Sequence, residues 1–488
     1  AKKAKVILLK ARAEYALQTD RNTSFLKKLT NDLGNGMEIL EAKKSVITSP
    51  ESINVLLENN KEVFDFAKKI NLELFEKTND LLYLSQAVSL HESALYNKIR
   101  IRLNINKNRD FNGVPKVVIL RENELRDQLN NISQDNEGSI SPVETLIKSK
   151  ENWTSFLDTL KQNYPKYYKM RYATIGESLN NIEKRIPENT TVVRYFYIEE
   201  TLNAFVVSKN GQKLFKLDTT EVEECITALG ENQSQLEQTS SCLDKLYTKL
   251  WKPFADEIKT ENVIIIPDGT LYNLSFETLT PKKIKSYKEL SNNSLLARYN
   301  ISYNYSLYLI DNSVKQKIIE NSFIAFAPEF NDKMKENYKL AVTDSLNLDK
   351  TYLTLLQQPF NANLAKTYSS FFDGDFFMNE NSTETIFKKK ANEHKIIHIG
   401  THAESNNISP ELSRLIFAKD IFNSSSEDGS LYTYEIYNTS LNSNLAILTA
   451  CETGKPSYQA GEGMISLAHA FNYAGSESIL TSLWNIDE

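Results

Sequence analysis

The spacing of hydrophobic residues changes once along the chain, near Arg185. Before this point apolar residues recur every three or four positions, which predicts amphipathic helices. After it, short apolar or alternating runs predict strands, and helix-like segments separate them. Strands that alternate with helices favour a mainly parallel sheet. We therefore expect an α + α/β protein, in which an N-terminal helical region precedes an α/β domain.

Two amphipathic segments in the first half are expected to form a hairpin of helices. Their apolar stripes are Phe66, Ile70, Leu74 and Phe75, then Leu82, Leu84, Ala87, Leu90, Ala94 and Leu95. The polar sequence KTND between the stripes is short enough for a tight turn. Antiparallel helices joined so briefly resemble a tetratricopeptide-type hairpin, with a plain helical bundle as the alternative. We assign residues 1–105 to such hairpins and residues 106–185 to a helical connector.

Local signals in the second half support alternating strands and helices. Asn210-Gly211 predicts a two-residue hairpin turn, and Val263–Ile266 has the pattern of a buried strand. Further along, NSTETIFKKK predicts a helix that begins with a capping box of Asn381 and Glu384. The order strand, helix, strand then continues to the end of the sequence.

Length and charge limit the class of protein. A chain of 488 residues is expected to form two or three domains. Its net charge of −6 gives no reason to expect nucleic acid as a partner. No apolar run reaches the roughly 18 residues of a membrane span and no leader sequence opens the chain, so no membrane partner is predicted. The first residues have the pattern of a helix interior, and the intact protein is expected to begin earlier.

Cysteine usage predicts a cytoplasmic location. Three cysteines are too few for a disulfide framework, which fits a reducing compartment. Cys225 and Cys242 lie in helical patterning without a histidine motif, and we expect them to be packing residues. The histidines and cysteines show no zinc spacing, and the chain has no phosphate-binding loop. We therefore predict neither a metal nor another cofactor.

Two short apolar runs end in turns that carry a reactive side chain. They read KIIHIGTHA, residues 395–403, and NLAILTACETG, residues 444–454. Runs of this kind are typical of strands buried on both faces, and α/β sheets place their ligands at the carboxyl ends of such strands. His402 and Cys451 are therefore expected side by side. A thiol beside an imidazole indicates a cysteine nucleophile.

Other histidines and the usual role of a buried cysteine offer alternatives. A lone cysteine in an apolar run is most often an inert core residue, but Cys451 leaves its run and enters a small-residue turn. His398 is the rival of His402 because it faces the same side of a strand, although its place inside the run favours burial. His469 lies in a helical segment, where a packing or surface role is expected.

Several motifs stand in the order found in a known family. They are VIIIPDGTLYNLSFETL, YNISYNYSLYLI, KIIHIGTHA, PELSRLIF, LAILTACETG and GEGMISLAHAFNYAGSESILTSLWNIDE. In this combination they resemble the CHAT domain, a caspase-like peptidase module first described attached to tetratricopeptide repeats. The resemblance runs from about Val192 onward. It implies a domain at residues 186–488, with a non-catalytic half at 186–380 and a catalytic half at 381–488.

The resemblance implies a cysteine endopeptidase with a Cys-His dyad. Cys451 would attack the peptide carbonyl, and His402 would protonate the leaving amine and then activate water. The backbone N–H groups of Cys451 and Ala403 would stabilise the oxyanion. Caspases, gingipains, legumains and separases share this order of histidine before cysteine.

The family also implies where a substrate would bind. The strand ILTSLWN, residues 479–485, would pair with an extended peptide, and Ser482 and Trp484 would line the pocket for the P1 residue. Separases have a similar Leu-Trp followed by acidic residues and cleave after arginine. Asp487 could therefore pair with a basic P1 side chain, or simply lie in solvent.

The sequence departs from the family in two places. The usual His-Gly is here His402-Ala403, and the chain ends at Glu488, where the family continues with further helices and a strand. The C-terminal end of the domain is therefore expected to be missing. We predict a bacterial-type peptidase of defence or signalling that cuts a protein substrate, with the helices binding a regulator or that substrate. One alternative is a helical scaffold with an inactive or gated peptidase-like domain. Another is hydrolysis of a non-peptide acyl substrate, which no motif in the sequence supports.

Overall fold

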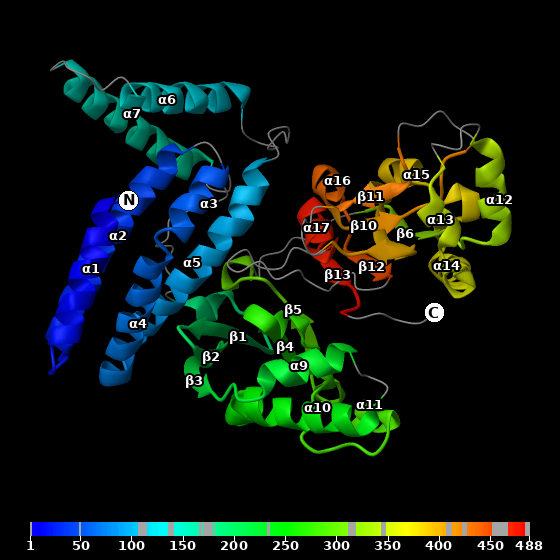
Figure 1. The fold of residues 1–488 in the computed structure, drawn as a ribbon, viewed down its shortest axis with the longest axis horizontal. Helices are drawn as coiled ribbons and strands as arrows, with labels where there is room; N and C mark the ends of the chain where they lie inside the picture. Colours follow the sequence, from blue (N-terminus) through cyan, green and yellow to red (C-terminus); the bar gives the residue numbers. More distant parts are fainter. Residues whose placement is uncertain are drawn as a thin grey trace. The chain divides into compact units, whose positions relative to one another are not determined.

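The computed structural model describes most of the chain (Figure 1). The described residues are 2–47, 50–105, 115–134, 141–164, 168, 179, 181–231, 235–310, 319–342, 348–406, 412–421, 427–450 and 467–483. Cys451, Trp484 and Asp487 lie outside them. The chain forms two compact units, and the second consists of Asp218–Glu261, Pro267–Ile301 and Asn312–Glu488.

The first unit begins with helices. They are α1 (Lys2–Leu17), α2 (Thr23–Val46), α3 (Pro50–Glu58), α4 (Lys61–Thr78), α5 (Leu81–Ile105), α6 (Lys116–Gln134) and α7 (Ser141–Asn163). The predicted hairpin is confirmed as α4 and α5, and Asn79, with φ of 52°, ends α4 in the left-handed conformation. Its stripe residues Phe66, Ile70 and Leu74 are buried in the core between α1, α2 and α4. Membership of the tetratricopeptide repeats stays a prediction.

Sheet A completes the first unit. It has the strand order β3-β2-β1-β4-β5. The strands are β1 (Thr190–Ile198), β2 (Thr201–Ser208), β3 (Gly211–Leu217), β4 (Asn262–Ile266) and β5 (Asn300–Tyr303). The predicted position of the hairpin turn is wrong by one residue, because Ser208 pairs with Gly211 and leaves Lys209 and Asn210 as the loop. Gly211, with φ of 143°, uses its freedom as the first strand residue and not within the loop.

The hairpin of α4 and α5 packs directly on sheet A. Leu84 and Val88 of α5 share one core with Phe196 and Phe205 of the sheet. The change of hydrophobic pattern near Arg185 thus marks where helices are followed by strands. Residues on both sides of this point nevertheless belong to one core. The predicted domain limits stay a prediction.

A fully buried ion pair ties the hairpin to the sheet. Arg194 of β1 donates from Nε to Glu92 of α5 over 2.5 Å, and both side chains have no exposed surface. The other carboxylate oxygen of Glu92 accepts hydrogen bonds from the Ser306 hydroxyl and the Leu307 N–H. Arg194 also donates to the carbonyl of Ile266. This buried charged pair therefore connects α5, sheet A and the segment after β5.

The second unit opens with a disulfide-linked pair of helices. These are α9 (Val222–Glu231) and α10 (Leu236–Leu250), and the short α11 (Leu290–Asn293) follows. Cys225 and Cys242 are buried as predicted, but the expectation of separate packing residues is wrong because their sulfurs are bonded. The facing helices bring the two Cα atoms to 5.1 Å, within the usual range for a disulfide. Disulfides are typical of oxidising compartments, so cysteine usage no longer supports the cytoplasmic location, which stays a prediction.

Sheet B confirms the predicted parallel sheet. Its order is β13-β12-β8-β6-β7, and all neighbouring strands are parallel. The strands are β6 (Asn321–Ala327), β7 (Asp375–Met378), β8 (His394–Gly400), β12 (Leu445–Thr449) and β13 (Ser478–Leu480). A small antiparallel sheet follows β8, made of β9 (Ala403–Glu404), β10 (Arg414–Ile416) and β11 (Ser430–Tyr432).

Helices cover both faces of sheet B. Helix α14 (Pro359–Phe372) lies on one face, and α15 (Glu384–Lys390), α16 (Thr433–Asn438) and α17 (Leu467–Ala474) lie on the other. Helices α12 (Asp332–Ala341) and α13 (Lys350–Thr354) instead pack around Phe330 and Ile416. Ile397 and Leu448 face the core with α15, α16 and α17, whereas Phe323 and Ile396 pack toward α14. Side chains therefore alternate between two faces along each strand, and this parity assigns each site residue to a face.

Candidate active site

His402 follows the central strand of sheet B. It comes two residues after Gly400, the last residue of β8, and is partly exposed. Gly400 is needed because a Cβ there would lie 2.8 Å from the side chain of Asn361. Beyond the strand, the carbonyl of His402 accepts a hydrogen bond from the N–H of Ile416 over 2.9 Å. The Thr401 hydroxyl donates a hydrogen bond to the carbonyl of Ile416. Strand β10 thus fixes the backbone that carries the imidazole.

The imidazole of His402 is contacted at both nitrogens. Its Nε2 lies 2.8 Å from the carbonyl oxygen of Leu356, and its Nδ1 lies 3.5 Å from the side-chain nitrogen of Gln358. Both residues belong to the segment just before α14. Sequence reasoning missed them because they lie more than forty positions away in the chain, in a polar stretch without a motif.

Phe330 supports the ring of His402 from a strained backbone position. Its ring centroid is 5.2 Å from that of His402 and 5.7 Å from that of Tyr352. Phe330 is fully buried and has φ of 54°, a conformation that is rare for a bulky side chain. Strain of this kind persists only where the surroundings fix it, and it gathers at functional sites.

Strands β8 and β12 are neighbours with aligned carboxyl ends. Thr449, the last residue of β12, pairs with Gly400. His402 and Cys451 each follow two residues after this pair in the chain. The Cys451 side chain itself is outside the described residues, so the expected approach of thiol and imidazole stays a prediction.

His398, the rival of His402, is a buried structural residue. It is 3% exposed, as the sequence favoured, and burial lowers the pKa of its imidazole to about 4. The neutral ring contacts the Thr449 hydroxyl at 3.0 Å from Nε2. That hydroxyl donates to Asn361 of α14 over 3.1 Å. The contacts join β8, β12 and the first turn of α14, so His398 stabilises the framework of the site.

The remaining predicted site residues are placed only in part. The Ser482 hydroxyl donates to the carbonyl of Ala450 over 3.0 Å, which fastens the chain after β13 to the end of β12. Ala403 begins β9 and pairs with Leu415. His469, expected on a packing or surface face, is 8% exposed and contacts the Tyr437 hydroxyl at 2.8 Å. The roles of Ser482, Ala403, Trp484 and Asp487 in catalysis stay predictions.

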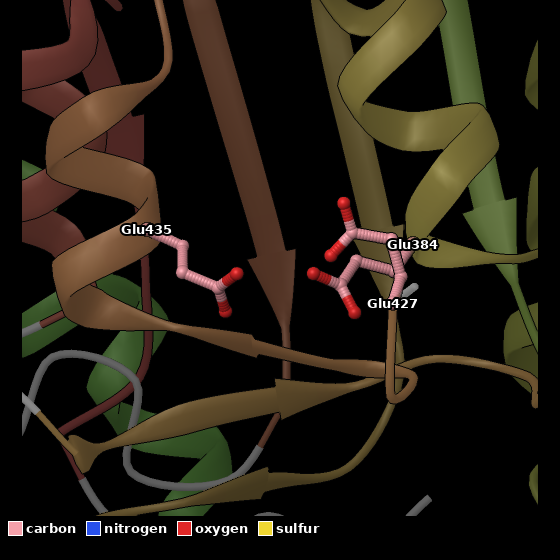
Figure 2. Close-up of side chains that lie close together, drawn as sticks. All are labelled: Glu384, Glu427 and Glu435. Carbon is pink, nitrogen blue, oxygen red and sulfur yellow. The ribbon is translucent and has the colours of Figure 1, made fainter. Parts of the chain in front are cut away.

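Sequence reasoning also missed a cluster of three carboxylates around one lysine. Glu384 begins α15, Glu427 precedes β11 and Glu435 lies in α16; their carboxylates point toward one another (Figure 2). Lys388 lies 2.6, 2.6 and 2.8 Å from them in that order. Its ammonium group supplies the positive charge that a metal would supply, so we assign no metal site here. The predicted capping box is wrong because Thr383 caps the helix, which turns Glu384 inward.

The cluster has unequal affinities for protons. Burial raises the pKa of Glu384 to about 8 against the opposing effect of Lys388. The hydrogen bond from Lys388 lowers the pKa of Glu427. Although burial opposes it, hydrogen bonds to the carboxylates raise the pKa of Lys388. The carboxyl of Glu384 thus keeps its proton near neutrality, whereas Lys388 stabilises the ionised carboxylate of Glu427.

Glu384→Gln is expected to change how stability depends on pH. Because the folded pKa of Glu384 lies above its unfolded value, its contribution is complete below about pH 4.5 and is lost as pH rises through about 8. Glutamine cannot lose a proton, so the urea midpoint of the variant should gain on that of the wild type between pH 5 and pH 8. Exposed Glu393→Gln is the control, and a constant difference across this range would contradict the expectation.

The fold and the site place the protein in a class, the parallel α/β domains with a histidine after the central strand. Residues 240–488 match the model of the CHAT domain, and the chain belongs to the CHAT-domain family, whose domain is of the caspase-like peptidase type. The predicted family is thereby confirmed, although the match begins later than the predicted start of the domain. No curated protein matched the chain. Among the described helices, none is long and apolar enough to cross a membrane.

Proposed function

We propose that the protein is a cysteine endopeptidase in which Cys451 is the nucleophile and His402 the general acid and base. One observation carries the proposal: the pairing of Thr449 with Gly400 aligns the ends of two adjacent strands. Thr449 contacts Asn361 on the α14 face, whereas Ala450 lies in the core of the other face. We propose that the side chain of Cys451 lies on the α14 face, where His402 meets Leu356. The alternation of side chains along β12 supports this placement.

The proposed reaction has two steps. The Cys451 thiolate attacks the peptide carbonyl and forms a C–S bond, and the oxyanion is held by the backbone N–H groups of Cys451 and Ala403. As the C–N bond breaks, the protonated His402 gives its proton to the leaving amine. Water then loses a proton to His402 and attacks the thioester, the C–S bond breaks, and the thiolate returns.

The substrate is proposed to bind along β13. This strand lies at one edge of sheet B and, among the described strands, pairs only with β12. An exposed edge of this kind can accept an extended peptide as a further strand. Ser482 and Trp484 are proposed to line the P1 pocket, with Asp487 pairing a basic P1 side chain. The helical region is proposed to bind a regulator or the substrate.

A gated peptidase-like domain is the second candidate. The observation that favours it is the engagement of both ring nitrogens of His402, because a base with no free nitrogen cannot transfer a proton. In this candidate a partner bound by the helices releases the site.

Labelling with an acyloxymethyl-ketone probe tests the proposal. Cys225 and Cys242 are joined, so Cys451 is the one thiol of the three that the disulfide leaves for the probe. The full-length protein should be labelled at Cys451, His402→Ala should slow labelling about 100-fold or more, and Cys451→Ala should abolish it. A peptide library with Lys or Arg at P1 tests the pocket. Absence of labelling in the wild type would exclude the active peptidase and leave the helical scaffold with an inactive or gated peptidase-like domain.

A further inference from the structure

The hydrogen-bonding partners of His402 determine which ring nitrogen can transfer a proton. A carbonyl oxygen only accepts hydrogen bonds, so the 2.8 Å contact with Leu356 requires a proton on Nε2. The neutral ring then has its lone pair on Nδ1. As long as Nε2–H remains bound to Leu356, every proton that enters or leaves the ring does so at Nδ1.

Gln358 lies at this nitrogen. Its side-chain Nε2 is 3.5 Å from Nδ1 of His402, the outer limit of a hydrogen bond. An amide N–H donates, and Nδ1 accepts. The amide therefore occupies the lone pair that a thiol or a water molecule would need.

The position of Gln358 is fixed by its neighbours. Its backbone N–H donates to the carbonyl of Glu329 over 2.8 Å, and the residue is 8% exposed. It caps α14, whose first turn is tied to β12 and β8 through Asn361, Thr449 and His398. These contacts hold the backbone of Gln358 and do not hold its side chain.

The contact between Gln358 and His402 is weak. The side-chain oxygen of Gln358 is buried and has no hydrogen-bond partner among the described residues. A buried oxygen without a partner makes this position of the Gln358 side chain unfavourable. Its long hydrogen bond to His402 contributes little stabilisation in return. A competing donor or acceptor at Nδ1 therefore displaces the amide easily.

We propose that the Gln358 amide closes Nδ1 of His402, the ring nitrogen that does not face Leu356, in the resting protein. The inference rests on the proposed function and specifies its resting state. The substrate displaces the amide, its leaving amine takes the proton from Nδ1 as the C–N bond breaks, and water returns a proton to the same nitrogen. Nε2–H stays bound to Leu356 throughout.

Substitution of Gln358 separates a closing contact from a supporting one. Gln358→Ala removes the amide, and Gln358→Met keeps the volume of the side chain if alanine disturbs folding. Gln357→Ala is the matched control, since this neighbouring glutamine is exposed. Diethyl pyrocarbonate, which acylates the unprotonated ring nitrogen, measures access to Nδ1 by peptide mapping of His402. Iodoacetamide measures the reactivity of Cys451.

Both Gln358 variants should react faster at His402 and at Cys451, by about two- to tenfold, the factor that corresponds to one neutral hydrogen bond. The control should match the wild type. Unchanged modification of His402 would overturn the inference, as would slower labelling of Cys451, which would make Gln358 a positioning residue. Faster modification of His402 in a protein whose Cys451 never reacts would support the closed nitrogen and refute the peptidase.

Discussion

Glu92→Gln is expected to lower the free energy of unfolding of the first unit by about 3–5 kcal/mol. The substitution removes the negative charge that lies beside the guanidinium of Arg194, in a site with no exposed surface. It also weakens the acceptor for the Ser306 hydroxyl and the Leu307 N–H. Equilibrium unfolding in urea, followed by circular dichroism, measures the loss.

A surface pair of the same residue types supplies the control. Arg12 and Glu62 lie 2.7 Å apart in the same unit, with side chains 43% and 63% exposed. Water screens such a pair, so Glu62→Gln should change stability much less than Glu92→Gln. Replacing the whole buried pair, with Glu92→Leu and Arg194→Met together, should recover much of the loss because no lone charge remains. Equal effects of the two single variants would contradict the expectation.

Gly475→Ala is expected to destabilise the second unit by about 2–5 kcal/mol. Gly475 lies between α17 and β13 with φ of 121°, where an L side chain is strained. Its added Cβ would also lie 2.0 Å from the carbonyl oxygen of Leu441, a backbone atom that cannot turn away. Because β13 flanks the candidate site, labelling of Cys451 should fall as well.

Gly34→Ala is the matched control for this substitution. Gly34 lies in the interior of α2, and an added Cβ meets nothing within 4 Å. Alanine is the better helix former, so stability should rise by about 0.5–1 kcal/mol. Thermal melting of both variants is sufficient, and a Gly475→Ala protein as stable as the wild type would show that the turn can adopt another conformation.

The sequence was sufficient for features that depend on local pattern. Apolar runs ending in His402 and Cys451 predicted two buried parallel strands, and β8 and β12 are confirmed as neighbours with paired ends. The burial of His398 followed from its place inside the run. Such features are readable because the period of burial along a strand depends only on successive residues.

Features that depend on distant segments were not readable. Leu356 and Gln358 reach His402 because the segment before α14 lies at the carboxyl ends of β8 and β12. Predicting the Cys225–Cys242 disulfide requires knowledge of the distance between two helices, and the sequence carries no signal for that distance. Glu384 was expected in a capping box with Asn381, but Thr383 caps the helix and Glu384 lies in a buried cluster. A helix cap two residues later than predicted thus accompanies a carboxyl that is buried.

The pair formed by Glu92 and Arg194 decides how the helices can be studied separately. A bait cut at residue 185 would carry Glu92 into solution without its cation and would strip α5 of the sheet that covers it. Such a fragment would expose apolar surface and attract unrelated proteins. A search for partners of the helical half should therefore keep β1, β2, β3, β4 and the segment Ser302–Asp311 attached.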